Sequence, residues 1–580
     1  MRLALLSEAM ARLPPELHHA GVYATSKELD FCSQRTEKEL AEILSGLSAY
    51  DCMGMIGRLS AWYYSTPSAP LPQAQAEVAD WLAGWDTQWR ERVRGALQRG
   101  AIVVFPQQLA HLARLVARYA DPRPPEEFAD DQQTQRDFLT CLFGVADLFF
   151  DADVDLRDPD DRLGWALRHT AVGQRRERLT LWSTYYEVFC RVWPALAEDG
   201  LPDVNAAFER FTGLSIRKFM AVGMAFSASF AAAHEGPVGR AWLDIDSYFS
   251  QTKLAAEDIR TFLKVSGTTL DQLQDNLAWE DRKFGKTTFG ALAYERTPLL
   301  VGPHGRVYLI SLESLERRVT EGILHVLAEG AEGEGGKRED YTSPFGKAFQ
   351  QWTAACFERV NGGFKDPPEL FVDVSYGPKR QPKDTPDVVL RYPRTIVAAE
   401  IVSGPMQART VTHGDLSAFQ ADLVKLVDKK AEQLTKRIAE ILAGEAAEIG
   451  LDADEVGSVW PVIITATSFP VRPEIGPVIR ARLKDKGFLQ DRKIRPVAII
   501  TAEEIAASEG SMAEGTSFVE LLAEWKRNAR TGDHPFKNFL IFRERDQRRL
   551  PAKHHRDTYA EASQDLVGLV LDPQAVDDAL

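Results

Sequence analysis

Hydrophobic residues recur at helical spacing through roughly the first 270 residues of the chain. Leu40, Leu44 and Leu47 follow one another at intervals of four and three residues, which places them on one face of a helix. Aromatic-rich stretches such as 138–150 and 179–193 have the same spacing, and proline-rich breaks separate such stretches. The pattern predicts a large helical N-terminal region.

The pattern changes near residue 297. Residues 298–310 form two short apolar runs about a Gly-Pro-His-Gly turn, which predicts a pair of short strands. Helical spacing returns over 312–327, and the Gly- and Glu-rich stretch 328–341 is typical of an exposed loop. We expect this part of the chain to form a strand-helix connector and a flexible loop.

From residue 343 the patterns alternate between helix and strand. The predicted elements are a helix at 344–360, strands at 369–375, 387–390 and 395–402, a helix at 416–442, a strand at 459–467, a helix at 475–483 and a strand at 495–501. This order predicts a mixed sheet with helices on both faces. A helix at 518–525 and a strand at 538–543 are expected to follow.

The fold class predicted is therefore α+β and multidomain. A chain of 580 residues exceeds what one hydrophobic core organises, and about two to four domains are expected. We place the divisions at 1–285 for the helical region, 286–342 for the connector, 343–510 for the mixed-sheet domain and 511–580 for a C-terminal extension.

The composition restricts the class of protein further. A net charge of −15 opposes nonspecific attraction to nucleic acid, so any such contact must come from local basic patches. Five widely spaced cysteines without a CxxC pair indicate reduced thiols in a cytoplasmic protein. The N-terminal apolar run is too short for a secretory signal, and no stretch reaches the roughly 20 apolar residues of a membrane span.

Two carboxylates occupy corresponding points of neighbouring predicted strands. Asp387 opens one strand after Pro386, and Glu400 lies near the end of the next, within an otherwise apolar run. Adjacent strands would bring both to one end of the sheet, where two acidic oxygens can hold a cation such as Mg²⁺. A simple turn residue is the alternative for Asp387.

The element order, with Pro386-Asp387 and Glu400 at these points, resembles the PD-(D/E)XK restriction-endonuclease-like superfamily over residues 343 to about 505. The resemblance implies metal-dependent hydrolysis of a phosphodiester, with Mg²⁺, or Mn²⁺ in its place, bound by Asp387, Glu400 and the backbone carbonyl of Ile401. The superfamily's motif lysine lies two residues after the glutamate. This chain has Val402 there.

Lys430 is the candidate replacement, because some members of the superfamily carry the lysine on the following helix. Lys430 falls inside the apolar stripe of the predicted helix 416–442. A buried, unpaired ammonium is costly, so we expect Glu400 as its partner. The alternative is a stem packed on the sheet with its head in water. Gln433 is expected at the edge of the stripe, within reach of a phosphate.

Basic residues flank the two carboxylates. Lys379, Arg380 and Lys383 lie on the turn before Asp387, and Arg409 follows Glu400. A further group lies near the C-terminus: Arg543, Arg545, Arg548, Arg549, Lys553 and Arg556. Such clusters can bind the backbone of DNA or RNA despite the overall acidity. An ordinary charged turn and a solvated tail are the alternatives.

Other polar clusters are interpreted as follows. Gln350, or Glu358 two turns later, stands where the first helix of the superfamily often adds an acidic ligand. The acidic run 151–155 lacks the glycine and terminal glutamate of a calcium loop and is expected to be solvated. The pair His554-His555 is expected at the surface.

Two hypotheses result. The first is a metal-dependent nuclease whose helical region is regulatory or binds a partner, through contacts with another protein or a second copy of the chain; a role in bacterial antiviral defence fits this arrangement. The second, given Val402, is a catalytically inactive nuclease-fold protein that acts in nucleic-acid binding or assembly.

Overall fold

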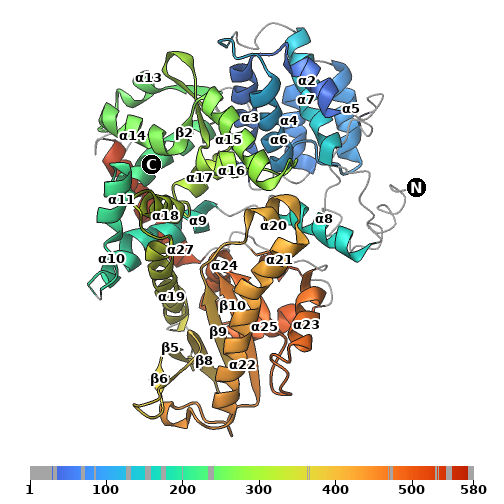
Figure 1. The fold of residues 1–580 in the computed structure, drawn as a ribbon. Coiled ribbons are helices and arrows are strands. Elements are labelled where there is room, and N and C mark those ends of the chain that lie inside the picture. Colours follow the sequence, from blue (N-terminus) through green and yellow to red (C-terminus); the bar gives the residue numbers. More distant parts are fainter. Residues whose placement is uncertain are drawn as a thin grey trace. The chain divides into compact units, whose positions relative to one another are not determined.

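A computed structural model describes Leu29 and residues 35–571, with the exception of short stretches at 67–71, 84–86, 126–131, 150–157, 172–177, 199, 233–240, 362–363, 365, 468, 471–474, 529–531, 533 and 544–551. The chain forms two compact units: the first comprises Met1–Val154, Lys218–Val319 and Leu566–Leu580, and the second comprises Asp155–Arg217 and Thr320–Asp565. The protein is an α+β multidomain protein, as predicted (Figure 1). The predicted divisions at 285, 342 and 510 stay predictions.

The first unit is largely helical. Its helices are α2 (Glu37–Leu44), α3 (Ala49–Ser65), α4 (Pro72–Ala83), α5 (Thr87–Gln98), α6 (Pro106–Tyr119), α7 (Gln132–Gly144), α12 (Ile216–Ala231, which begins at the unit boundary), α13 (Ile245–Phe249), α14 (Ala256–Ser266), α15 (Leu270–Phe284), α16 (Leu292–Arg296) and α17 (Leu312–Arg318). The predicted apolar positions Leu40, Leu44 and Leu47 are buried.

A four-stranded sheet completes this unit, in the order β1 (Trp242–Asp244), β4 (Arg306–Leu309), β3 (Leu299–Val301) and β2 (Gly267–Thr268). β3 and β4 pair antiparallel across the Gly-Pro-His-Gly turn, so the predicted strand pair is confirmed.

The second unit contains a five-stranded mixed sheet in the order β11 (Ala498–Thr501), β10 (Ser458–Thr465), β9 (Thr395–Val402), β8 (Val388–Tyr392) and β5 (Glu369–Val372). β8 runs antiparallel to both β5 and β9, whereas β9, β10 and β11 are parallel. A short hairpin, β6 (Ser375–Tyr376) and β7 (Lys383–Asp384), lies between β5 and β8 in the chain. These strands follow the predicted order.

The helices of the second unit are α8 (Pro159–Ala171), α9 (Arg178–Glu187), α10 (Trp193–Leu196), α11 (Val204–Thr212), α18 (Ile323–Gly333), α19 (Glu339–Asn361), α20 (Ala408–His413), α21 (Leu416–Leu423), α22 (Lys429–Leu442), α23 (Ile475–Asp485), α24 (Ala502–Ala513), α25 (Phe518–Arg527), α26 (Phe536–Arg543) and most of α27 (Lys553–Val570). None of the described helices is long and apolar enough to cross a membrane.

Helix α22 lies along β9 and β10 (Figure 1). Alternate residues of β9, Ile396 and Ala398, join Leu434 and Ile438 of the helix in one hydrophobic cluster. Since side chains alternate across a strand, Val397 and its alternate neighbours face the other side, where they are also buried. Both faces of the sheet are therefore covered, as the element order predicts.

One turn of π-helix, the π-turn η5 (Val424–Asp428), joins α21 to α22. The predicted helix 416–442 is thus continuous but contains one wider turn. Such turns hold an additional residue and recur at functional sites. The π-turn therefore sets the rotational position of every side chain on α22.

Two predicted elements are wrong. Residues 538–543 form part of helix α26, not a strand, because Phe536, Phe539 and Leu540 are buried at helical spacing. The stretch 328–341 is mainly helical: α18 continues to Gly333 and α19 begins at Glu339. The expected acidic loop at 151–155 and Arg545, Arg548 and Arg549 lie outside the described residues.

Candidate metal and phosphate site

The register of β8 and β9 places the two candidate carboxylates opposite each other. Val388 pairs with Ala399 in the antiparallel ladder, so Asp387 and Glu400 are the next opposed positions. Glu400 shares the strand face of Ala398, which packs against α22. The backbone N–H of Ile401 donates a hydrogen bond of 2.7 Å to Asp387 Oδ2, which fixes the orientation of that carboxylate.

Lys430, on the first turn of α22, reaches both carboxylates. Its Nζ atom lies 3.0 Å from Glu400 Oε2 and 3.6 Å from Asp387 Oδ2. The Glu400 side chain is 1% exposed and the Lys430 side chain 20%. The expected partnership of Lys430 with Glu400 is therefore present, and the ammonium does not simply extend into water.

Arg437 is a second cation at the same site, which the sequence interpretation missed. Its guanidinium donates a hydrogen bond to Glu400 Oε1 and lies 3.8 Å from Asp387 Oδ1. Arg437 follows Lys430 by seven residues, or nearly two helical turns, so the two share a helix face. That spacing was the signal in the sequence that could have identified it.

Burial and charge oppose each other at Glu400. Burial raises the pKa of the Glu400 carboxyl above its ordinary value, and the nearby charge of Asp387 raises it further, while Lys430 and Arg437 act to lower it. Two carboxylates and two cations make the cluster electrically neutral when all four are ionised. A neutral cluster tolerates a low-exposure position better than a single charge does.

The donor set suits a hard divalent cation. Mg²⁺ binds through one or two carboxylates and keeps several waters. Because the N–H and C=O of a strand residue point to the same side, the carbonyl of Ile401 is directed, like its N–H, toward the Asp387 side of β9. Asp387, Glu400 and Ile401 thus fit Mg²⁺ or Mn²⁺, provided that one of the two cations gives way.

The remaining candidate ligands lie further out. Gln433 is exposed on α22, and Glu358 is exposed on α19. Gln350 is partly buried on the same helix, whose Gly346 lies against Ser403 just beyond the end of β9. Among the described contacts, none joins Gln433, Glu358 or Gln350 to Asp387 or Glu400.

The basic residues divide into two kinds. Lys379 and Arg380 are exposed at the tip of the β6–β7 hairpin. Lys383, at its base, instead forms ion pairs with Glu440, at 3.5 Å, and with Glu445. Arg409 is 57% exposed and lies 3.1 Å from Asp415. Two of the four predicted nucleic-acid contacts are therefore already paired with acids.

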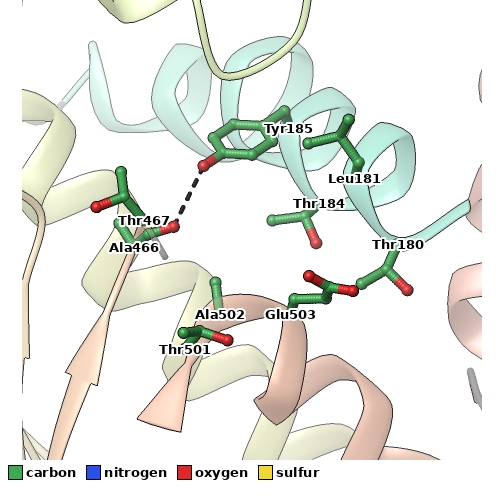
Figure 2. Close-up of a pocket in the computed structure, with 9 residues that line it drawn as sticks. All are labelled: Thr180, Leu181, Thr184, Tyr185, Ala466, Thr467, Thr501, Ala502 and Glu503. Atoms are coloured by element: carbon green, nitrogen blue, oxygen red, sulfur yellow. Dashed lines mark hydrogen bonds between the residues drawn. The ribbon is translucent and has the colours of Figure 1, made fainter. Parts of the chain in front are cut away.

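A small pocket lies at the carboxyl ends of β10 and β11 (Figure 2). Tyr185 closes one side by donating a 3.3 Å hydrogen bond to the carbonyl of Ala466. The buried Thr184 hydroxyl has no hydrogen-bond partner in the described part of the chain, and Glu503 lies across from it. The pocket has a volume of about 20 Å³, which is enough for one water molecule. It therefore does not accommodate a substrate.

The surface position predicted for the histidine pair is wrong for His555. His555 is fully buried and lies between Ser183 Oγ, at 3.2 Å, and Glu509 Oε1, at 2.9 Å. His554 lies 2.7 Å from Glu187 Oε1. His555 therefore lies in the interior, whereas the side chain of His554 is 33% exposed.

Cys356, Glu509 and His555 form a buried group with metal-ligand chemistry. However, Arg359 donates hydrogen bonds to Cys356 Sγ, at 3.2 Å, and to Glu509 Oε1, at 2.9 Å. The guanidinium already supplies the cation at this centre, and burial raises the pKa of the Cys356 thiol well above its ordinary value. This cluster is a buried ion-pair network that joins α19, α24 and α27.

Comparison of the chain with protein-family models, with curated proteins and with solved structures finds no match.

Proposed function

We propose that this protein is a metal-dependent nuclease that hydrolyses phosphodiester bonds of DNA or RNA at the site formed by Asp387, Glu400 and Lys430. The observation that carries the proposal is the ion pair between Lys430 and Glu400, with Asp387 beside it. This places an ammonium beside two carboxylates although the position two residues after Glu400 carries Val402. The resemblance to the PD-(D/E)XK superfamily supplies the class of reaction.

In this proposal each residue has a separate role. Asp387, Glu400 and the Ile401 carbonyl would hold a Mg²⁺ ion, and such an ion would supply an activated water and neutralise charge on the phosphate. Lys430 orients that water and donates to the oxyanion that develops during attack. Water adds to phosphorus, the P–O bond to the leaving oxygen breaks, and that oxygen takes up a proton.

Cleavage assays on DNA and RNA with Mg²⁺ or Mn²⁺ test this function. Asp387→Asn, Glu400→Gln and Lys430→Met should each lower cleavage by about a hundredfold or more. Lys429→Met is the matched control, because Lys429 is the exposed neighbour of Lys430 on the same helix. Equal cleavage by the wild type and all three site variants would reject the assignment.

The inactive alternative also has an observation in its favour. Both oxygens of Glu400 already have a cationic partner, so the cluster is balanced without a metal ion. A protein of this kind would bind nucleic acid in a metal-independent manner and leave it intact. Binding without cleavage under any divalent cation would favour this function over the first.

The first unit is assigned a regulatory or partner-binding role within the same proposal. Its helices contribute none of the residues of the carboxylate cluster, all of which belong to the second unit. Asp387→Asn, which alters the carboxylate cluster alone, should therefore not change partner binding by the first unit. Pull-down of partners from the source cells with the wild type and the variant measures this.

A further inference from the structure

The carboxylates of Asp387 and Glu400 offer two bridging positions, each of which holds one cation. Lys430 Nζ lies between Oδ2 of Asp387 and Oε2 of Glu400, at 3.6 and 3.0 Å. Arg437 lies between the other two oxygens, in contact with Oε1 and 3.8 Å from Oδ1. A divalent ion shared by both carboxylates must take one of these positions.

Lys430 and Arg437 each donate one hydrogen bond to Glu400, but the two positions differ at Asp387. Oδ2 of Asp387 also accepts the N–H of Ile401 at 2.7 Å. Oδ1 has only the 3.8 Å approach of Arg437 among the contacts of the described residues, which is too long for a hydrogen bond. Of the two Asp387 oxygens, the one beside Arg437 is therefore the less satisfied, which favours the Arg437 position for a divalent ion.

The charge of the metal-bound cluster would favour movement of the displaced Arg437 guanidinium toward solvent. Two carboxylates, one ammonium and one divalent ion sum to a single positive charge, so Arg437 would no longer be attracted to the cluster. Its side chain is 20% exposed, so it can leave toward solvent without movement of the helix. A guanidinium at the rim matches the oxygens of a phosphate in a two-point hydrogen bond.

We propose that Arg437 holds the place of the divalent ion in the metal-free protein and, once displaced, binds the phosphate of the substrate. The first step concerns metal binding alone; the second rests on the proposed nuclease function. Arg437 is thus both the competitor of the metal ion and a phosphate-binding residue.

The first step is tested by Mn²⁺ titration, with free Mn²⁺ measured by electron paramagnetic resonance. Arg437→Gln removes the competitor and should tighten Mn²⁺ binding roughly tenfold, whereas Asp387→Asn should weaken it. Lys436→Gln is the matched control, since Lys436 is the exposed neighbour of Arg437, and it should bind as the wild type does. Unchanged or weaker binding by Arg437→Gln overturns the proposal.

The wild type provides a second test that does not depend on a folded variant. Phenylglyoxal labels accessible arginines, and peptide mass spectrometry reads the label on Arg437. Mn²⁺ should raise labelling of Arg437 several-fold and leave Arg359, in the separate buried network, unchanged. Labelling of Arg437 that stays constant or falls with Mn²⁺ contradicts the displacement.

The second step is tested by nuclease assays at saturating Mn²⁺. Arg437→Gln should then cleave more slowly, with a higher KM for the nucleic acid, despite its tighter metal binding. If no form of the protein cleaves but Mn²⁺ displaces Arg437, the proposed function fails and the displacement stands. If the wild type cleaves and Arg437→Gln matches it in both Mn²⁺ affinity and KM, the nuclease function stands, and Arg437 neither competes with the metal ion nor binds the phosphate.

Discussion

The ammonium of Lys430 lies 3.0 Å from the carboxylate of Glu400, although the two residues are separated by 30 positions and lie on different elements. A helix thus supplies the cation that the strand itself lacks. The relationship has consequences that can be measured at the site, in stability and in nucleic-acid binding.

A lysine returned to strand β9 should compensate for the loss of Lys430. Val402 lies two residues after Glu400 and faces the same side of the strand, partly buried against the core under α22. We expect Val402→Lys/Lys430→Met to cleave about tenfold faster than Lys430→Met alone. The control is Val402→Met/Lys430→Met. Equal cleavage rates for the two double variants would show that a lysine at position 402 does not replace Lys430.

The ion pair should also contribute to stability. Lys430→Met leaves Oε2 of a carboxylate that is 1% exposed without its donor, which should cost about 1–3 kcal/mol. Glu400→Gln/Lys430→Met should recover part of this, because the double variant removes the uncompensated charge. Chemical denaturation followed by tryptophan fluorescence measures the wild type, Glu400→Gln, Lys430→Met and the double variant in a double-mutant cycle. Additive effects would mean that the pair is not coupled.

The buried network of Glu509 should make stability depend on pH. Burial alone would raise the pKa of Glu509, but the hydrogen bond with His555 and the charge of Arg359 outweigh it and hold the pKa below its ordinary value of 4.5. Ionised Glu509 therefore stabilises the fold above pH 4.5, and this contribution is lost as the pH falls through the lowered value.

Glu509→Gln tests this linkage. At pH 7 the variant should be less stable by about 3 kcal/mol, because it leaves Arg359 without its carboxylate. The gap from the wild type should close as the pH falls below 4.5. Denaturation midpoints recorded from pH 7 to pH 3 provide the measurement, and a gap independent of pH would exclude the ionised form as the cause.

The hairpin tip should contribute to nucleic-acid affinity. Lys379 and Arg380 are exposed, and their joint replacement by Gln should lower the slope of log affinity against log salt by about 2. Lys383→Gln should have a smaller effect, because Lys383 is paired with Glu440 and Glu445. Fluorescence anisotropy at several salt concentrations measures this. Lys484→Gln, at an exposed position of α23, is the control, and an equal loss with it would indicate a nonspecific effect of charge.

The sequence was sufficient to predict the parts of the fold where periodicity is strong. The stripe of helix 416–442 predicts the position of Lys430 correctly, because Leu434, Ile438 and Ile441 lie on the same side of the π-turn and define the buried face of α22. The strand predicted at 538–543 is wrong, because a short apolar run fits either period. Phe536 and Phe539 share the buried face of a helix there.

Only part of the site can be predicted from the sequence. The order of the strands pairs Asp387 with Glu400, but the sequence does not give the distance between a helix and a sheet, which decides which side chains meet. Arg437 contacts Glu400 across nearly two turns of helix, a reach that depends on the separation of helix and sheet. The surface position predicted for His555 is wrong because the burial of this histidine depends on two partners, Ser183 and Glu509, that are distant in the chain.

The π-turn Val424–Asp428 couples the packing of α22 to the position of its two cations. If the same residues formed a regular α-helix, α22 would be rotated by about 100° relative to α21. Lys430 and Arg437 would then leave Glu400, and Leu434 and Ile438 would leave the hydrophobic cluster that they form with β9. The additional residue of this turn thus keeps both the apolar side chains and the cations of α22 on the face toward the sheet.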